Sequence, residues 1–182
     1  MADPIPAEVQ QLLDRQAILD CIHRYSRALD RHDDEMLASC FHPDAIDNHG
    51  AWVGDLEAFV EWANHDVHDP YAAHTHNISC HFAEIDGDVA HTESYVIFIL
   101  RHKDGEQVKV GGGRYLDRLE RRSGDWKIAL RHLVLDWRFE ADGTAFNTND
   151  GYVHGTWDTS DMSYDRPLEL TDAMKKEIAS RG

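Results

Sequence analysis

The stretch HNISCHFAEIDGDVAHTESYVIFILR, residues 76–101, decides the fold, because two β-rich runs meet in it at Asp86-Gly87. An Asp-Gly pair between such runs is typical of a tight hairpin turn, since glycine accepts the positive φ that the turn requires. Similar turns follow at Asp104-Gly105 and Ser123-Gly124. The pattern predicts four long antiparallel strands, joined in sequence order as a meander.

The four predicted strands are residues 76–85, 89–101, 107–121 and 126–140. Strands of this length form a sheet that twists and curls. A run of glycines at 111–113 lies in the middle of the third strand. We expect a sharp bend there, because glycine inside a strand often marks one.

The residues before this meander show helical periodicity. From Ala7 to about Asp30, apolar residues recur at helical spacing with charged residues on the other side. Asp33 can cap a short second helix that reaches Phe41 and ends before Pro43, because the residue preceding a proline avoids the helical region. A strand near 45–53, a third helix near 56–63 and a polar loop at 65–75 complete this part. Helices first and an antiparallel sheet last indicate the α+β class.

Length and charge limit the possible functions. A chain of 182 residues with 42% hydrophobic content can bury one core, so we expect a single domain over 1–182. Its core should span about 7–140, and a polar tail at 141–182 should cover the domain or a neighbouring subunit. A net charge of -16 argues against binding to nucleic acid or to anionic membranes. Without a signal-peptide pattern or a long apolar run, the protein is expected to be soluble and cytoplasmic.

The chain carries no strong signal for a metal or a cofactor. Its cysteines are far apart and odd in number, which favours buried free thiols over a disulfide framework. They are Cys21, Cys40 and Cys80. The spacing of His65 with His68, and of His74 with His76, is only weak evidence for a metal site. Because no glycine-rich nucleotide-binding motif is present either, we expect neither a metal nor a cofactor.

Two polar residues fall on apolar strand faces. Alternation along the first predicted strand puts His76 on the same face as Ile78, Cys80 and Phe82. In the last strand, Arg131 falls in an apolar row. That row consists of Ala129, Leu133, Leu135, Trp137 and Phe139. An unpaired buried charge costs on the order of several kcal/mol, so both side chains should be paired or should line a cavity.

A carboxylate lies within reach of the same cavity. Asp30 ends the first predicted helix, where the helix dipole and burial are expected to raise its pKa. If it accepts a hydrogen bond from one ring nitrogen of His76, the other nitrogen becomes a base that faces the cavity. Tyr25 and Tyr115 could each donate a hydrogen bond to a substrate oxygen, and Arg131 could stabilise developing negative charge.

Each of these residues also has a structural interpretation. His76 could be a satisfied core histidine, and Tyr25 fits the apolar stripe of the first helix. Asp30 could pair with a neighbouring arginine at the surface. Arg131 could belong to a buried ion pair, and Tyr115 could be an ordinary strand aromatic. The catalytic hypothesis rests on the convergence of all five.

Three stretches together resemble a known family. They are ILDCIHRYSRALDRHDDEMLASCFHPDA, HNISCHFAEIDGDVAHTESYV and GGGRYLDRLERRSGDWKIALRH. They look like the cone-shaped, nuclear transport factor 2-like proteins of the polyketide cyclase and dehydratase group, over about residues 10–140. That group includes scytalone dehydratase, bile-acid 7α-dehydratase and hexachlorocyclohexane dehydrochlorinase. The resemblance implies a curved antiparallel sheet packed against three N-terminal helices, and lyase chemistry without a cofactor.

The resemblance also implies roles for individual residues. Asp30 and His76 match the catalytic dyad of these enzymes, and Tyr25 matches a tyrosine five residues before the dyad aspartate. Arg131, after the Trp-Lys segment, corresponds to an arginine that helps to hold the leaving group.

Four further residues are expected to bind the substrate. They are Tyr115, His49, Asn77 and Trp52. His49 and Asn77 occupy cavity positions at which the relatives differ. The long C-terminal tail also departs from the dehydrochlorinase, so the relatives' substrates cannot be copied to this chain.

We therefore expect a cofactor-independent lyase that acts on an apolar cyclic or aryl substrate such as a steroid, a polyketide or a lignin-derived aromatic. The protein should be a homo-oligomer, and the resemblance implies a trimer. Dehydration is the default reaction. Release of formaldehyde by retro-aldol cleavage, isomerisation and cyclisation are the other reactions that the same dyad could support. A non-catalytic small subunit of an aromatic-ring dioxygenase and a ligand-binding protein are the alternatives from other classes.

Overall fold

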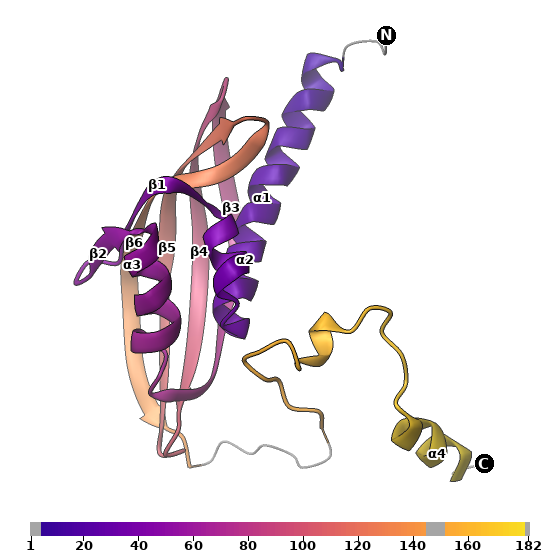
Figure 1. Ribbon diagram of the computed structural model, residues 1–182. Coiled ribbons are helices and arrows are strands. Elements are labelled where there is room, and N and C mark those ends of the chain that lie inside the picture. The colour runs from indigo at the N-terminus through magenta and orange to yellow at the C-terminus, as the bar shows by residue number, and fades with distance from the viewer. Residues whose placement is uncertain (1–4, 145–151, 181–182) are drawn as a thin grey trace.

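A computed structural model describes residues 5–144 and 152–180, and Figure 1 shows its elements. The N-terminal part contains α1 (Ala7–Arg31), α2 (Asp34–Ser39), β1 (Phe41–Asn48), β2 (Val53–Asp55), α3 (Leu56–Glu61) and a π-helical segment (Trp62–Val67). The long strands are β3 (Tyr71–Asp86), β4 (Val89–His102), β5 (Gln107–Arg122) and β6 (Asp125–Asp142). A 3-10 turn (Met162–Tyr164) and α4 (Asp172–Ser180) lie in the tail.

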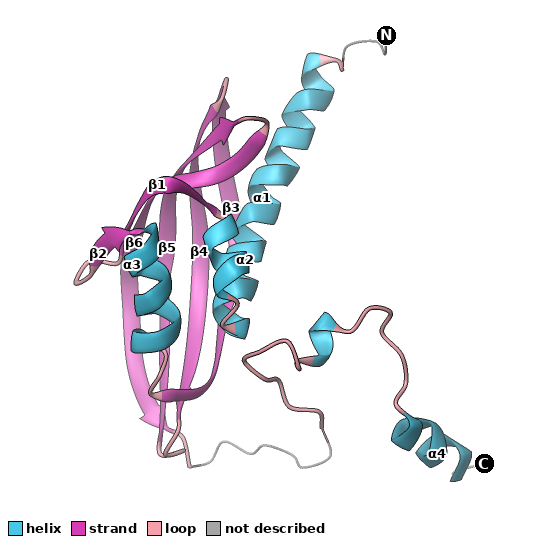
Figure 2. Ribbon diagram, in the orientation of Figure 1, coloured by secondary structure: helices cyan, strands magenta, loops and turns pink. Residues whose placement is uncertain are grey.

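The predicted meander and the α+β class are confirmed. The sheet has six strands in the order β2-β1-β6-β5-β4-β3, and the four long strands pair antiparallel in sequence order. One pair is parallel, because β1 runs alongside β6 in the same direction. Figure 2 shows α1, α2 and α3 on one side of the curved sheet. The core lies between these helices and the sheet.

Helix α1 places Asp30 against the sheet. Its buried stripe includes Ile18, Ile22, Tyr25 and Leu29, at helical spacing. The helix ends at Arg31 and is capped by His32, whose backbone is left-handed with φ 50° and whose N–H bonds back to the carbonyls of the last turn. Asp30 therefore lies in the last turn, next to the residue that completes the buried stripe.

Two strands begin earlier than the sequence predicts. The second helix ends at Ser39 instead of Phe41, and β1 begins at once, because it pairs with β6. Strand β3 begins at Tyr71, within the segment 65–75 that was expected to be a loop. Tyr71 is buried and pairs with His102 on β4, so tertiary pairing overrides the polar local composition.

A shift in register between Ile78 and His81 makes one prediction about β3 wrong. An extra residue in a strand reverses which side chains face inward beyond it. His76 and Ile78 are partly buried, whereas Phe82 is 61% exposed and Cys80 is exposed as well. The expected shared face therefore ends at Ile78, and the expectation of buried thiols holds for two of the three cysteines, Cys21 and Cys40.

The apolar row on β6 is interrupted in the same way. The register shifts opposite Gly112 and Gly113, where a bend was expected. Beyond this point, the large apolar side chains of β6 are about half exposed, so the buried row that contains Arg131 ends at Leu133. The exposed side chains are Leu135, Trp137 and Phe139.

The glycine run makes room for its neighbours. A Cβ atom on Gly111 would lie 2.2 Å from the ring of Phe98, and one on Gly112 would lie 2.4 Å from the ring of Trp137. At Gly113, the obstacle is the backbone carbonyl oxygen of Val134, at 2.2 Å. The glycines therefore allow aromatic rings and a neighbouring strand to approach β5 closely.

The described part of the tail contacts the end of α1. Arg27 donates hydrogen bonds to Ser163, and its guanidinium lies 4.7 Å from the ring centroid of Tyr164. Arg31 forms an ion pair with Asp161 at 3.3 Å. The tail thus reaches back to the helix that carries Asp30, as Figure 1 shows.

Replacing Gly113 with alanine should destabilise the fold. The new Cβ would overlap a backbone carbonyl that cannot rotate away, and overpacking of this kind costs about 1–3 kcal/mol. Urea denaturation should therefore show Gly113→Ala to be about 2 kcal/mol less stable than the wild type, with Arg118→Ala as an exposed control on the same strand. Equal midpoints for Gly113→Ala and the wild type would contradict the close approach.

Candidate active site

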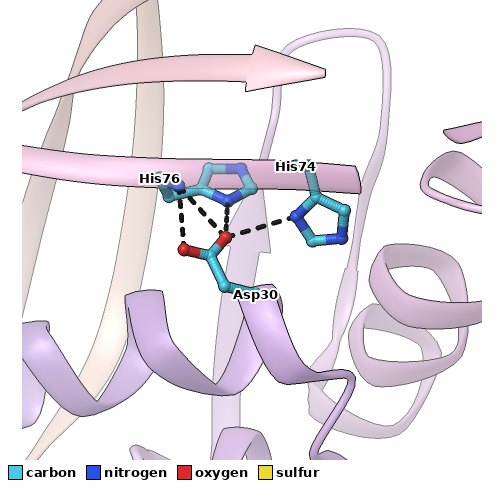
Figure 3. Close-up of side chains that lie close together, drawn as sticks. All are labelled: Asp30, His74 and His76. Atoms are coloured by element: carbon cyan, nitrogen blue, oxygen red, sulfur yellow. Dashed lines mark hydrogen bonds and ion pairs between the residues drawn. The ribbon is translucent and has the colours of Figure 1, made fainter. Parts of the chain in front are cut away.

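Asp30 and His76 meet where the end of α1 touches β3 (Figure 3). Nδ1 of His76 lies 2.8 Å from Oδ1 of Asp30, and the His76 backbone N–H donates to both carboxylate oxygens at 3.0 Å. His74 approaches the same Oδ1 with its Nδ1 at 3.2 Å. The structure thus brings the two predicted partners together and adds a third residue. His74 alternates with His76 along the strand, and this spacing is the signal that could have found it.

The Asp30 carboxyl is held in its ionised form. Burial acts to raise its pKa, but the hydrogen bonds from His74 and His76 outweigh burial and leave the pKa below its ordinary value. The expectation of a raised pKa is therefore wrong, because it counted the helix dipole and burial without the N–H donors of β3. The ionised Asp30 carboxylate accepts a hydrogen bond from Nδ1 of His76, so Nδ1 carries the ring proton. Nε2 is then the nitrogen that remains free to act as a base.

His76 lines a cavity of about 180 Å³ between the helices and the sheet. Most of the wall is apolar, with polar groups confined to a few side chains. The apolar residues are Leu29, Phe59, Trp62, Ala63, Val67, Phe98, Leu100 and Leu133. The polar residues are Tyr25, His49, His68, His76 and Tyr115. Such a lining suits a small apolar ligand that is oriented by a few hydrogen bonds.

Tyr25 and Tyr115 form one end of this cavity, with ring centroids 5.4 Å apart in an edge-to-face arrangement. Burial raises the pKa of both hydroxyl groups, so each stays protonated. The Tyr25 hydroxyl is buried and has no hydrogen-bond partner among the residues that the structure describes. It is therefore available to donate to a ligand oxygen.

Arg131 lies behind the tyrosines and is not part of the cavity wall. Its guanidinium donates to both oxygens of Asp117, at 2.6 and 2.7 Å, and both side chains are fully buried. The same guanidinium lies 3.9 Å from the ring centroid of Tyr25 and 4.2 Å from that of Tyr115. In this geometry Arg131 supports the two rings by cation–π contact and belongs to a buried ion pair.

The other predicted binding residues fall in three different places. His49 lines the cavity. Trp52 is half-buried and stacks on Trp62 at 4.7 Å, so it packs against a wall residue without reaching the cavity. Asn77 is exposed and bonds the carbonyl of Ile97, because the neighbour of an inward-facing strand residue points outward.

A cluster of histidines extends from the dyad towards the tail. Nε2 of His74 lies 2.8 Å from Nε2 of His32, and the ring of Trp157 stacks on His32 at 4.0 Å. The ring of His68 stacks on His74 at 4.3 Å. Burial lowers the pKa of His32 to about 4 and that of His68 to about 2, so both rings are neutral near neutral pH. Because these residues come from four separate segments, sequence periodicity does not reveal the cluster.

Asp30, His74 and His76 are also close enough to hold a metal ion, since their ligand atoms lie within 4.8 Å of one another. Their hydrogen bonds argue for another use. Nδ1 of each histidine lies within hydrogen-bond distance of the Asp30 carboxylate, and an Nδ1 that donates to a carboxylate carries a proton and so has no lone pair for a metal. The arrangement fits a carboxylate that orients imidazoles.

The neutral state of His68 predicts how stability depends on pH. The folded protein disfavours protonation of His68, whereas the unfolded chain binds a proton near pH 6.5, so stability falls as the pH drops below about 6.5. For a buried ring, this loss is about 1 kcal/mol per pH unit. His68→Gln should reduce the slope of unfolding free energy between pH 6 and 5 by about that amount, measured by urea denaturation. Parallel pH profiles for the two proteins would contradict this.

No helix within residues 5–144 and 152–180 is long and apolar enough to cross a membrane.

No curated protein matches the chain. Solved structures do match it. A Mycobacterium tuberculosis protein of unknown function is 30% identical with a TM-score of 0.64, and the match covers 74% of this chain and 78% of that one.

Two matching structures have names that indicate an activity. A hexachlorocyclohexane dehydrochlorinase, LinA type 3 from Novosphingobium barchaimii, is 20% identical with a TM-score of 0.72, over 79% of this chain and all of the other. A scytalone dehydratase-like protein from Novosphingobium aromaticivorans is 20% identical with a TM-score of 0.66, over 76% of this chain and 97% of the other. At these identities, the likeness shows the shared fold.

The family is shown by sequence as well as by fold. The SnoaL-like domain matches residues 10–132, which include most of α1, Asp30, His76 and most of the meander. The curved sheet and this match agree with the resemblance found in the sequence. The chain belongs to the SnoaL-like domain family of the nuclear transport factor 2-like superfamily.

Proposed function

We propose that this protein is a cofactor-independent lyase in which His76, oriented by Asp30, removes a carbon-bound proton from a small apolar substrate. The observation that carries the proposal is the 2.8 Å contact between His76 and Asp30 at the wall of an apolar cavity. The names of the LinA and scytalone dehydratase-like relatives, which are those of elimination enzymes, support the same reaction class.

The reaction begins at Nε2 of His76. This nitrogen takes the proton, and the Asp30 carboxylate stabilises the imidazolium that forms. The Tyr25 hydroxyl donates a hydrogen bond to a substrate oxygen, where negative charge develops. General base catalysis contributes about 10²- to 10⁴-fold, and orientation within the cavity contributes to the remainder. Loss of water is the default outcome, and release of formaldehyde from a hydroxymethyl substrate is the alternative.

The size of the cavity favours a substrate with one ring. An engineered cavity of about 150 Å³ in another protein binds benzene, so a cavity of about 180 Å³ is large enough for a single ring with short substituents. A steroid, with four fused rings, would extend beyond this volume. We therefore favour a monocyclic or monoaryl substrate over the larger compounds that the sequence allows.

Loss of the base should abolish turnover without loss of the fold. On the aldol adduct of benzaldehyde and acetone, His76→Ala and Asp30→Asn should each lower kcat at least about a hundredfold. Loss of water is followed by the ultraviolet absorbance of the conjugated enone, and cleavage is followed by the release of benzaldehyde.

Thr75→Ala is the matched control, because Thr75 lies between the two histidines on β3 and is exposed. It should retain wild-type activity. Turnover by His76→Ala at a rate near that of the wild type would refute the assigned base.

We also propose that the chain forms a homo-trimer through the outer face of the sheet. The strand register places Gly112 of β5 between Ile97 of β4 and Trp137 of β6. The side chains of Trp137 and Phe139 are 46% and 53% exposed. Apolar side chains gathered in this way favour a protein interface. Sedimentation should give a mass of about three times 20.8 kDa, and Trp137→Glu should lower it. A wild-type monomer that requires a larger partner would instead favour a dioxygenase small subunit.

A further inference from the structure

A second imidazole–carboxylate pair faces the cavity that holds His76. His49 lines the cavity wall, and its Nδ1 is hydrogen-bonded to Oδ1 of Asp47. Asp47 lies near the end of β1 and is the register partner of Arg131 on β6. The side chains of His49 and Asp47 are 13% and 1% exposed. The cavity is thus flanked by two histidines, each bound through Nδ1 to an aspartate from a different part of the fold.

The two carboxylates are satisfied in different ways. Asp30 receives three N–H groups from His74 and His76, so its charge is satisfied while the His76 ring is neutral. Asp47 is hydrogen-bonded to His49 alone among the described residues, and its Oδ2 has no partner.

The neighbouring cation is hydrogen-bonded to a carboxylate other than Asp47. Arg131 is already bonded to both oxygens of Asp117, and no ion pair joins it to Asp47 in the part of the chain that the structure describes. A buried carboxylate needs a compensating positive charge. For Asp47, the group in contact that can supply it is the imidazolium form of His49.

We propose that His49, held by Asp47, is the general acid that protonates the leaving oxygen while His76 removes the carbon-bound proton. This inference rests on the proposed lyase function and specifies its leaving group. A departing halide or carboxylate leaves as a stable anion, whereas hydroxide is a poor leaving group unless it is protonated. A site with an acid as well as a base in one cavity wall is therefore suited to β-hydroxy substrates and to the release of water.

The step is balanced in atoms and charge. Nε2 of His76 takes the proton, and the electrons of the C–H bond form the new double bond. The C–O bond breaks, its electron pair goes to oxygen, and that oxygen takes the Nε2 proton of the His49 imidazolium. The products are the alkene, water, a protonated His76 and a neutral His49. The Nδ1 proton of His49 stays on the ring and remains hydrogen-bonded to Asp47. Transfer of one proton from His76 to His49 through solvent restores the starting state.

The test compares two substrates that give the same product. One is the aldol adduct of benzaldehyde and acetone, and the other is its acetate ester, because elimination from either yields benzylideneacetone. Hydroxide needs an acid to leave, whereas acetate does not. His49→Gln should therefore lower kcat on the hydroxy compound at least about a hundredfold, and should lower kcat on the acetate less than about fivefold.

The remaining variants separate the possible outcomes. Asp47→Asn should show the same dependence on the leaving group, because Asp47 acts as a positioning residue for His49. His132→Gln, an exposed histidine on β6, should behave like the wild type on both compounds. His76→Ala should lose activity on both compounds. Retained activity on the acetate also shows that His49→Gln is folded.

Equal losses on the two substrates, or a change in KM alone, would refute His49 as the acid while leaving the base assignment intact. Wild-type protein that eliminates neither compound would instead refute the proposed lyase function, and the role of His49 with it.

Discussion

The site depends on the hydrogen bonds that join the Asp30 carboxylate to strand β3. They tie the last turn of α1 to the first half of the meander, and they hold the pKa of Asp30 below its ordinary value against the effect of burial. The same contacts select the tautomer of His76. One set of bonds therefore orients the helix on the sheet, keeps the carboxylate charged and leaves a basic nitrogen at the cavity wall.

The interior buries several charged side chains. Arg131 and Asp117 neutralise each other behind the two tyrosines, and Asp30 and Asp47 each depend on imidazoles. Buried ion pairs are weak evidence for stability, because desolvation offsets much of their attraction. Their positions around one apolar cavity give them a clearer role, which is to orient the aromatic rings and imidazoles that line it.

Sequence periodicity and family resemblance could predict the fold class, the meander, and the pairing of Asp30 with His76. The four long strands follow from their Gly-containing turns, and His76 is visible as a polar residue within an apolar alternation. The bulge after Ile78 could not be predicted, because Cys80 and Phe82 continue the apolar alternation past the point at which the register shifts. This is why Cys80 and Phe82 were assigned to the wrong face.

Two residues near the cavity are missing from the sequence predictions. Asp47 of β1 is hydrogen-bonded to His49, only two residues further along the chain. His32 follows α1 and meets His74 of β3 through tertiary contact, which sequence periodicity does not show. The pKa of Asp30 was predicted in the wrong direction for the same reason, since its N–H donors lie on a strand more than forty residues away. Arg131 was correctly identified as buried among apolar residues, but its Asp117 partner and its place behind the tyrosines needed the structure.

Hydrogen exchange on a substrate analogue tests proton abstraction by His76 most directly. Benzylacetone has one aromatic ring and acidic hydrogens beside its ketone, but it has no leaving group, so exchange in deuterium oxide reports the base alone. Wild-type protein should incorporate deuterium beside the carbonyl well above the solvent rate, and His76→Ala should not. Equal incorporation by the two proteins would show that His76 is not the base.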